Sequence, residues 1–161
     1  MSLPEQCAND SIEIRKDGRW FHEGGLIARP QLVKLFSTVL RREEDGSYWL
    51  VTPVERTRVR VEDAPYLGLE VKEEFRGEGP RQLVSLRTNI DQWITFGPEN
   101  PLRVVADEQT GEPSLYAELG KGLEARLVRS AWFHLVELSE SRGRDFGFWS
   151  DGVFHVLGDA E

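Results

Sequence analysis

The sequence predicts an α+β fold made of two small subdomains that are built mostly from antiparallel sheets. Two observations support this prediction. Most segments alternate apolar and polar residues with the period of two typical of a half-buried strand, and only two segments carry apolar residues at helical spacing. Asp-Gly and other turn signals separate the strand segments, which favours hairpins and antiparallel pairing. A joint at Asp63-Ala64-Pro65 divides the chain into residues 10–64 and residues 65–161.

The N-terminal subdomain begins with a predicted hairpin, because residues 12–14 and 19–22 flank the turn pair Asp17-Gly18. A helix is expected to start at Pro30, since proline is favoured at the first helical position. The apolar positions that follow have the spacing of a single helical face; they are Leu32, Leu35, Phe36, Val39 and Leu40. Two further strands are predicted at residues 48–51 and 56–61, on either side of Pro53.

The C-terminal subdomain is predicted to be richer in strands. Residues 67–71 and 83–87 alternate in polarity and are joined by a Gly-Pro turn, so they are expected to pair. Shorter strands are expected at residues 92–96, 102–105, 115–119 and 123–127. A second helix is predicted at residues 129–139, with Trp132, Leu135, Val136 and Leu138 as its buried positions. A last hairpin over residues 146–157 turns at Asp151-Gly152.

The sequence contains an internal echo. The tetrapeptide Asp-Gly-any-aromatic occurs at residues 17–20, 45–48 and 151–154. A Leu-Val pair precedes two of these occurrences, at Leu32-Val33 and Leu135-Val136. The echo predicts a duplicated helix-plus-hairpin motif, one copy in each half. The alternative is that Asp-Gly turns before aromatic residues are simply common.

Composition excludes several classes of function. The 161 residues include 20 Lys and Arg against 28 Asp and Glu, a net charge of -8 that opposes binding to nucleic acid. A single cysteine, Cys7, rules out an internal disulfide framework and a multi-thiolate zinc site, and is typical of a reducing compartment. The N-terminal ten residues lack the basic start and apolar run of a secretory signal, and no apolar run has the length of a membrane span. We therefore expect a cytoplasmic protein with no nucleic-acid or membrane partner.

No catalytic motif is recognisable in the sequence. A nucleophile elbow, a P-loop and a His-Glu-x-x-His pattern are all missing, and the three histidines are too far apart in sequence to form a metal site by local spacing. His22 and Glu23 precede Gly24-Gly25 and suggest a general base, but adjacent residues on a strand point to opposite faces. We expect no enzyme, no cofactor and no metal; a hydrolase or transferase that uses His22 with Asp63 or Asp91 is the least favoured alternative.

The most specific charge pattern is Arg56-Thr57-Arg58-Val59-Arg60-Val61. Alternation on a strand places Arg56, Arg58 and Arg60 on one face, about 7 Å apart, where guanidinium groups can hold the oxygens of a phosphate or another anion. The alternative is a solvated face whose arginines pair with glutamates of a neighbouring strand, such as Glu70, Glu73 or Glu74.

A second polar cluster, Arg87-Thr88-Asn89-Ile90-Asp91, lies between two predicted strands. Such loops commonly serve only to cap a turn. If the two halves face one cleft, Arg87, Asn89 and Asp91 could instead orient a small ligand together with Asp63 and the arginine strand. Trp20 could then provide a stacking surface for that ligand, and His22 is a further candidate contact.

Several segments resemble a bacterial family known as domain of unknown function 1285. The resemblance rests on residues 17–24, 32–36 and 50–55, and Asp63-Ala64-Pro65 and Arg87-Thr88-Asn89 extend it. It implies a two-part α+β fold with duplicated motifs, a second half loosely like pleckstrin-homology domains, and a site between the halves for a nucleotide-like ligand in signalling.

Two functions follow as expectations. The first is a cytoplasmic sensor or adaptor that binds a small anionic, nucleotide-like ligand between its halves and takes part in signal transduction. The second is a protein-interaction module, with no small-molecule ligand, that docks another chain through a sheet edge or an aromatic patch.

Overall fold

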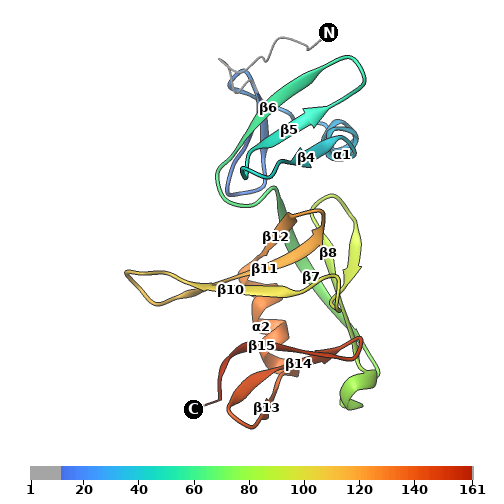
Figure 1. Cartoon of the computed structure of the whole chain (residues 1–161), viewed down its shortest axis with the longest axis vertical. Helices are drawn as coiled ribbons and strands as arrows, with labels where there is room; N and C mark the ends of the chain where they lie inside the picture. The colour runs from blue at the N-terminus through green and yellow to red at the C-terminus, as the bar shows by residue number, and fades with distance from the viewer. Residues whose placement is uncertain (1–11, 161) are drawn as a thin grey trace. The chain divides into compact units, whose positions relative to one another are not determined.

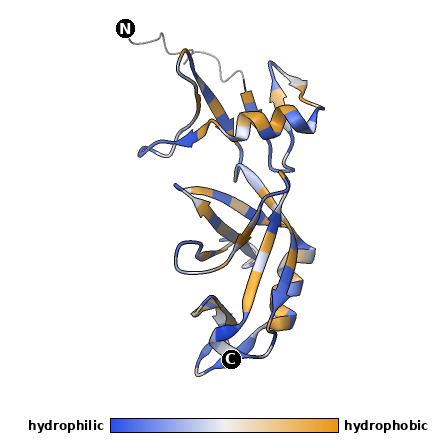
Figure 2. Cartoon of the chain, turned by 90° about the vertical axis from the view of Figure 1, so that its right-hand side faces the viewer, coloured by the Kyte–Doolittle hydropathy of each residue, from blue (hydrophilic) through white to orange (hydrophobic). Residues whose placement is uncertain are grey.

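The computed structural model describes residues 12–160, and Cys7 and the acidic N-terminal segment lie outside this range. The chain divides into two compact units at Pro65 (Figure 1). Most strand pairs in both units are antiparallel, as predicted. Apolar and polar residues alternate along the strands, which is visible as alternating orange and blue segments in Figure 2.

The N-terminal unit contains one six-stranded sheet and one helix. The sheet has the order β3-β2-β1-β6-β5-β4, and β1 and β6 pair in parallel. Its strands are β1 (Ile12–Ile14), β2 (Trp20–His22), β3 (Gly25–Leu26), β4 (Leu40–Arg42), β5 (Tyr48–Val51) and β6 (Arg56–Val61). Helix α1 (Pro30–Ser37) connects β3 to β4. The short strands β3 and β4 were not predicted, because neither shows alternation over enough residues to be recognised.

Helix α1 and one face of this sheet form the core of the N-terminal unit. Trp20 is buried there and its ring stacks on that of Phe36, with 6.3 Å between the ring centroids. The predicted helical face is only partly correct. Leu40 is buried but belongs to β4, whereas Leu35 lies on the helix and is 61% exposed.

The C-terminal unit contains a second six-stranded sheet, of order β10-β11-β12-β7-β8-β9. Its strands are β7 (Tyr66–Glu74), β8 (Leu83–Thr88), β9 (Trp93–Thr95), β10 (Leu102–Ala106), β11 (Pro113–Gly120) and β12 (Leu123–Leu127). The predicted pairing of β7 with β8 is confirmed, and a short 3-10 helix, η1 (Gly79–Arg81), connects the two strands. The parallel pairing of β7 with β12 was not predicted, because the two strands are far apart in sequence.

Helix α2 (Arg129–Leu138) packs on β7 and closes the core of the C-terminal unit. The prediction of buried positions is correct for Leu135 and Leu138, while Trp132 is only partly buried. It is wrong for Val136, which is 39% exposed; Ala131 is buried instead. A helix of three turns buries only the narrow stripe that faces the sheet, and hydrophobicity alone does not locate that stripe.

A three-stranded sheet of β13 (Glu140–Arg142), β14 (Asp145–Ser150) and β15 (Val153–Asp159) completes the C-terminal unit. Buried polar contacts join it to β8. The Ser150 hydroxyl donates to the carbonyl of Phe96 at 2.7 Å and accepts from the amide of Val84 at 2.8 Å. These bonds satisfy backbone groups that would otherwise be buried without partners.

The predicted duplication is present as a helix followed by a three-stranded antiparallel meander. In the N-terminal unit α1 precedes β4, β5 and β6, and in the C-terminal unit α2 precedes β13, β14 and β15. The Asp-Gly pairs do not occupy equivalent turns, however. Asp45-Gly46 joins the first and second strands of its meander, whereas Asp151-Gly152 joins the second and third. The motif is therefore repeated, but the spacing from Leu-Val to Asp-Gly does not mark matching positions.

Candidate functional site

The arginine side chains of the predicted strand lie on one face of the N-terminal sheet. Strand β6 alternates as expected, because Val59 is buried while Arg58 and Arg60 are exposed. Register places Arg58 opposite Trp49 on β5, and Arg60 opposite Glu13 on β1. We refer to Arg56, Arg58, Arg60 and Trp49 as the arginine face.

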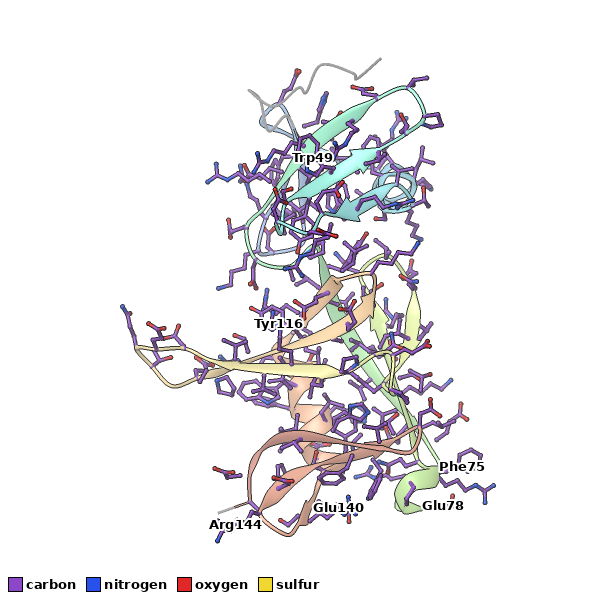
Figure 3. The ribbon with its side chains drawn as sticks, in the orientation of Figure 1. Trp49, Phe75, Glu78, Tyr116, Glu140 and Arg144 are labelled. Carbon is purple, nitrogen blue, oxygen red and sulfur yellow. The ribbon has the colours of Figure 1, made fainter. Side chains whose placement is uncertain are left out.

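Trp49 on β5, labelled in Figure 3, lies opposite Arg58 and contacts two of these arginines. The guanidinium carbon of Arg56 lies 4.4 Å from the centroid of the indole ring, and that of Arg58 lies 5.8 Å away. The indole nitrogen donates to the Ser47 hydroxyl at 2.8 Å, and Trp49 is only 6% exposed. Stacking on an indole orders a guanidinium and leaves its N–H edge available for oxygen acceptors. Sequence reasoning missed Trp49, because its position beside the arginines depends on the pairing of β5 with β6.

Acidic side chains balance part of this positive charge. Arg56 donates from Nη2 to Oε1 of Glu43 at 2.8 Å, and this partner comes from the β4–β5 connection rather than from the glutamates of β7. The pKa of Asp45 lies below its usual value, mainly because its carboxylate accepts hydrogen bonds from Ser47, with a smaller effect from the charge of Arg58. These contacts hold the arginines in place but leave Arg58 and Arg60 exposed to solvent.

Two predicted site residues lie on the opposite face. His22 is opposite Ile12 in the β1–β2 pair, and Ile12 is opposite Val59, so His22 projects from the face that α1 covers. Trp20 shares that face and is only 1% exposed, packed on Phe36. The prediction that Trp20 offers a stacking surface for a ligand is therefore wrong, because its ring is part of the core.

The predicted loop cluster lies in the C-terminal unit, and its side chains make contacts within that unit. Arg87 lies between Glu70, at 3.0 Å from its Nε, and Asp91, at 3.1 Å from its Nη1. These two carboxylates raise the pKa of Arg87 above its usual value, with the hydrogen bond to Glu70 as the largest cause. The Asn89 carboxamide accepts from the amide of Leu67 at 3.1 Å. Each of these contacts stabilises the turn between β8 and β9 or its junction with β7.

The remaining candidate groups are placed as follows. Asp63 is half-buried in the connection after β6. His134 on α2 lies 2.8 Å from a carboxylate oxygen of Glu73 on β7, an arrangement that fixes the helix to the sheet.

Within residues 12–160, no cluster of three or more His, Cys, Asp or Glu side chains is suited to hold a metal ion. None of the helices in this range has the length and apolar character needed to cross a membrane.

Both halves of the chain match family models. Residues 3–64 match the model described as "Domain of unknown function (DUF1285), N-terminal domain", and residues 65–157 match "Protein of unknown function (DUF1285), C-terminal domain". The chain belongs to the DUF1285 family. The resemblance stated from the sequence is thus confirmed, and the two-domain organisation is that of the family.

Two solved DUF1285 structures resemble this chain. A DUF1285 family protein from Silicibacter pomeroyi DSS-3 is 39% identical, with a TM-score of 0.86 over 93% of this chain and 80% of the other. A DUF1285 family protein from Shewanella baltica OS155 is 27% identical, with a TM-score of 0.61 over 80% of this chain and 91% of the other. No protein with a curated description matches the chain.

Proposed function

We propose that this DUF1285 protein is a sensor or adaptor module that binds a small anionic, phosphate-bearing ligand, with nucleotides as the leading candidates. The arginine face holds the anion. The observation that supports this proposal is the pair of guanidinium groups of Arg56 and Arg58 over the Trp49 ring, at 4.4 and 5.8 Å, in a chain whose overall charge is -8.

The chemistry of the face suits oxygen ligands. A guanidinium presents paired N–H donors that match two oxygens of a phosphate group. Arg58 and Arg60 are two residues apart on one strand, so their Cα atoms are about 7 Å apart, a distance that a di- or triphosphate can bridge. Because Trp49 is covered by Arg56 and Arg58, we assign the arginines to the phosphates and no stacking role to the indole.

A thermal-shift titration tests the proposal. The purified protein is titrated with nucleotides, sugar phosphates and inorganic phosphate, since a ligand present at 100 times its Kd stabilises the folded state by about 2.7 kcal/mol. We expect a saturable rise in Tm with phosphate-bearing ligands. Arg58→Glu should abolish that rise, because it replaces an attracting charge by a repelling one in the centre of the arginine face.

Two further variants test whether loss of the ligand-induced shift is specific to the charge at position 58. Arg144→Glu makes the same change of charge at an exposed position of the C-terminal unit and should leave the ligand-induced shift unchanged. Arg58→Gln removes the charge but keeps a polar side chain, and it should weaken the shift without disturbing the fold. If Arg58→Glu retains the full shift, or if no phosphate-bearing compound produces one, the proposal is wrong.

A protein-interaction module is the second candidate function. Phe133 and Val136 are 51% and 39% exposed and lie three residues apart on α2, so they are neighbours on one helix face and can form part of an exposed apolar patch of the kind that marks a docking surface. We also propose, from the order of a six-stranded sheet followed by α2, that the C-terminal unit is loosely like pleckstrin-homology domains. Partner capture that survives Arg58→Glu but is lost in Phe133→Ser would favour this function.

A further inference from the structure

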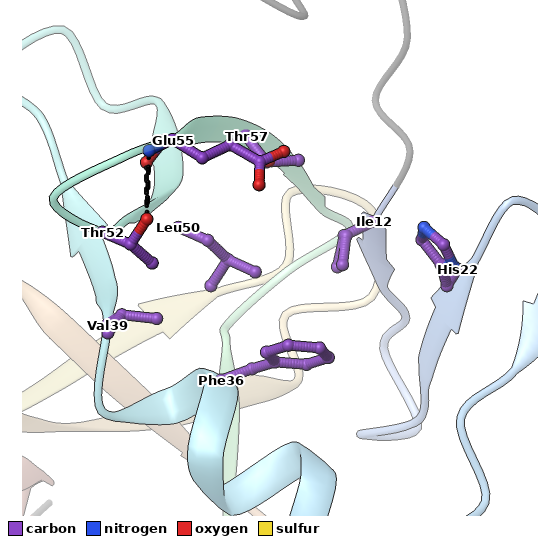
Figure 4. A pocket seen from close by; sticks show the side chains of 8 residues that line it. All are labelled: Ile12, His22, Phe36, Val39, Leu50, Thr52, Glu55 and Thr57. Carbon is purple, nitrogen blue, oxygen red and sulfur yellow. Dashed lines mark hydrogen bonds between the residues drawn. The ribbon is translucent and has the colours of Figure 1, made fainter.

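The N-terminal unit has a pocket on the face opposite the arginines. Its volume is about 230 Å³, and it opens between α1 and the sheet (Figure 4). Half of the residues that line it are apolar: Ile12, Phe36, Val39 and Leu50. A pocket of this size is smaller than the range of about 300–1,000 Å³ typical of drug-sized ligands, so its occupant is small.

One side of the pocket carries a carboxylate. Glu55 lies in the turn between β5 and β6, and its Oε1 accepts a hydrogen bond from the Thr57 hydroxyl at 3.2 Å. The turn is held by Thr52, whose hydroxyl accepts from the Glu55 amide at 3.0 Å. Within residues 12–160, no lysine or arginine forms an ion pair with Glu55. The carboxylate therefore keeps acceptor sites for a ligand.

His22 supplies a second polar group to the pocket (Figure 4). In the part of the chain that the structure describes, its imidazole makes no hydrogen bond with another side chain. A neutral imidazole has one nitrogen that accepts a hydrogen bond. The lining of the pocket thus combines an apolar wall with acceptors, and it includes no lysine or arginine.

We infer that this pocket binds a small organic cation, a primary amine carried on an apolar body. The ammonium group has three donors, which suits the oxygens of Glu55, and the apolar body would lie against Phe36 and Leu50. A carboxylate or phosphate ligand would be repelled by Glu55. This second site is independent of the arginine face in its chemistry, although Thr57 in the pocket and Arg56 and Arg58 on the other face belong to the same strand.

The probe is phenethylamine, with two analogues of similar shape as controls. Phenethyl alcohol lacks the charge, and 3-phenylpropionate reverses it. A ligand of this size is expected to bind with a Kd of about 1 mM, which amide chemical shifts measure well. We expect saturable shifts at residues of β5, β6 and α1 with the amine, weaker shifts with the alcohol and none with the acid.

Substitution of Glu55 tests whether its carboxylate binds the amine. Glu55→Gln keeps the shape of the side chain and removes its charge. Because Glu55 is exposed, the affinity for the amine should fall by about twofold to fivefold, the range for an exposed ion pair. Glu44→Gln makes the same change at an exposed turn position and should leave the affinity unchanged. Arg58→Glu should also leave amine binding unchanged, which separates this inference from the proposed function.

Three results would overturn the inference. The first is the lack of saturable amine binding at these residues. The second is equal affinity for 3-phenylpropionate, which would mean that Glu55 does not select the charge of the ligand. The third is unchanged amine affinity in Glu55→Gln, which would place the amine elsewhere on the protein.

Discussion

At the scale of single residues, polar side chains buried in the core differ in whether they have hydrogen-bond partners. Ser150 is fully buried, and its hydroxyl contacts backbone groups of both Val84 and Phe96. His155 is also buried, but its Nε2 has no hydrogen-bond partner within the described residues. Its ring lies 5.1 Å from that of Phe148 and 5.8 Å from that of Phe96. His155 therefore packs as an aromatic core residue, and its burial disfavours the charged form of the ring.

The burial of His155 predicts how stability depends on pH. Burial lowers the pKa of His155 below its usual 6.5, and a smaller opposing effect comes from the backbone of Ser150. Below pH 6.5 the unfolded state therefore binds more protons than the folded state, so the stabilisation present at neutral pH is lost as the pH falls. This residue should lower the free energy of unfolding by up to about 1.4 kcal/mol per pH unit. Urea unfolding between pH 8 and pH 5, at about one-unit intervals, measures the slope.

His155→Phe is the matching variant. It keeps an aromatic ring beside Phe96 and Phe148 but cannot be protonated, so its stability should depend less steeply on pH in this range than that of the parent protein. Identical slopes would show that the pH dependence arises from other groups.

At the scale of secondary structure elements, burial depends on which side of a helix faces its sheet. Leu35 on α1 and Leu135 on α2 both belong to apolar stripes at helical spacing, and the sequence predicts both as core residues. The structure separates them: Leu135 is 0% exposed, whereas Leu35 is 61% exposed. Helix α1 has no buried residue at all, and it covers its sheet through half-buried side chains such as Phe36.

This difference predicts unequal effects of the same substitution. Leu135→Ala should lower the free energy of unfolding by about 2–5 kcal/mol, because it leaves a cavity in the packed core of the C-terminal unit. Leu35→Ala should change it by no more than about 0.5 kcal/mol, since an exposed leucine loses few contacts. Chemical denaturation of both variants provides the comparison. Similar effects at the two positions would contradict the burial pattern described for the helices.

Strand β6 contributes side chains to both faces of the N-terminal sheet. Thr57 lines the pocket, while Arg56 and Arg58 contact Trp49 on the other side of the sheet. The side-chain period of two makes this separation a property of the strand itself. The prediction that three arginines share one face was made from this period, whereas the separation of His22 from them required the register of β1 with β2 and β6.

At the scale of the whole molecule, an acidic chain carries a local concentration of arginine. The net charge of -8 repels polyanions at long range, while the arginine face attracts an anion small enough to approach it closely. We therefore expect no binding of a labelled DNA duplex at physiological salt, as measured by fluorescence anisotropy. A duplex that binds and is displaced by free nucleotide would instead assign the arginine face to nucleic acid.

The sequence by itself determined the class of most elements, the joint near Pro65, the membership of the family and the alternation of β6. These are local properties, set by periodicity, turn residues and motif order within short segments. Only the tertiary structure decided that Trp20 is a core residue, that Trp49 orders the arginines, and that His22 and Glu55 line one pocket. The physical reason is that these relations depend on strand register and on the side of each helix that packs, and both are set by contacts between residues far apart in the chain.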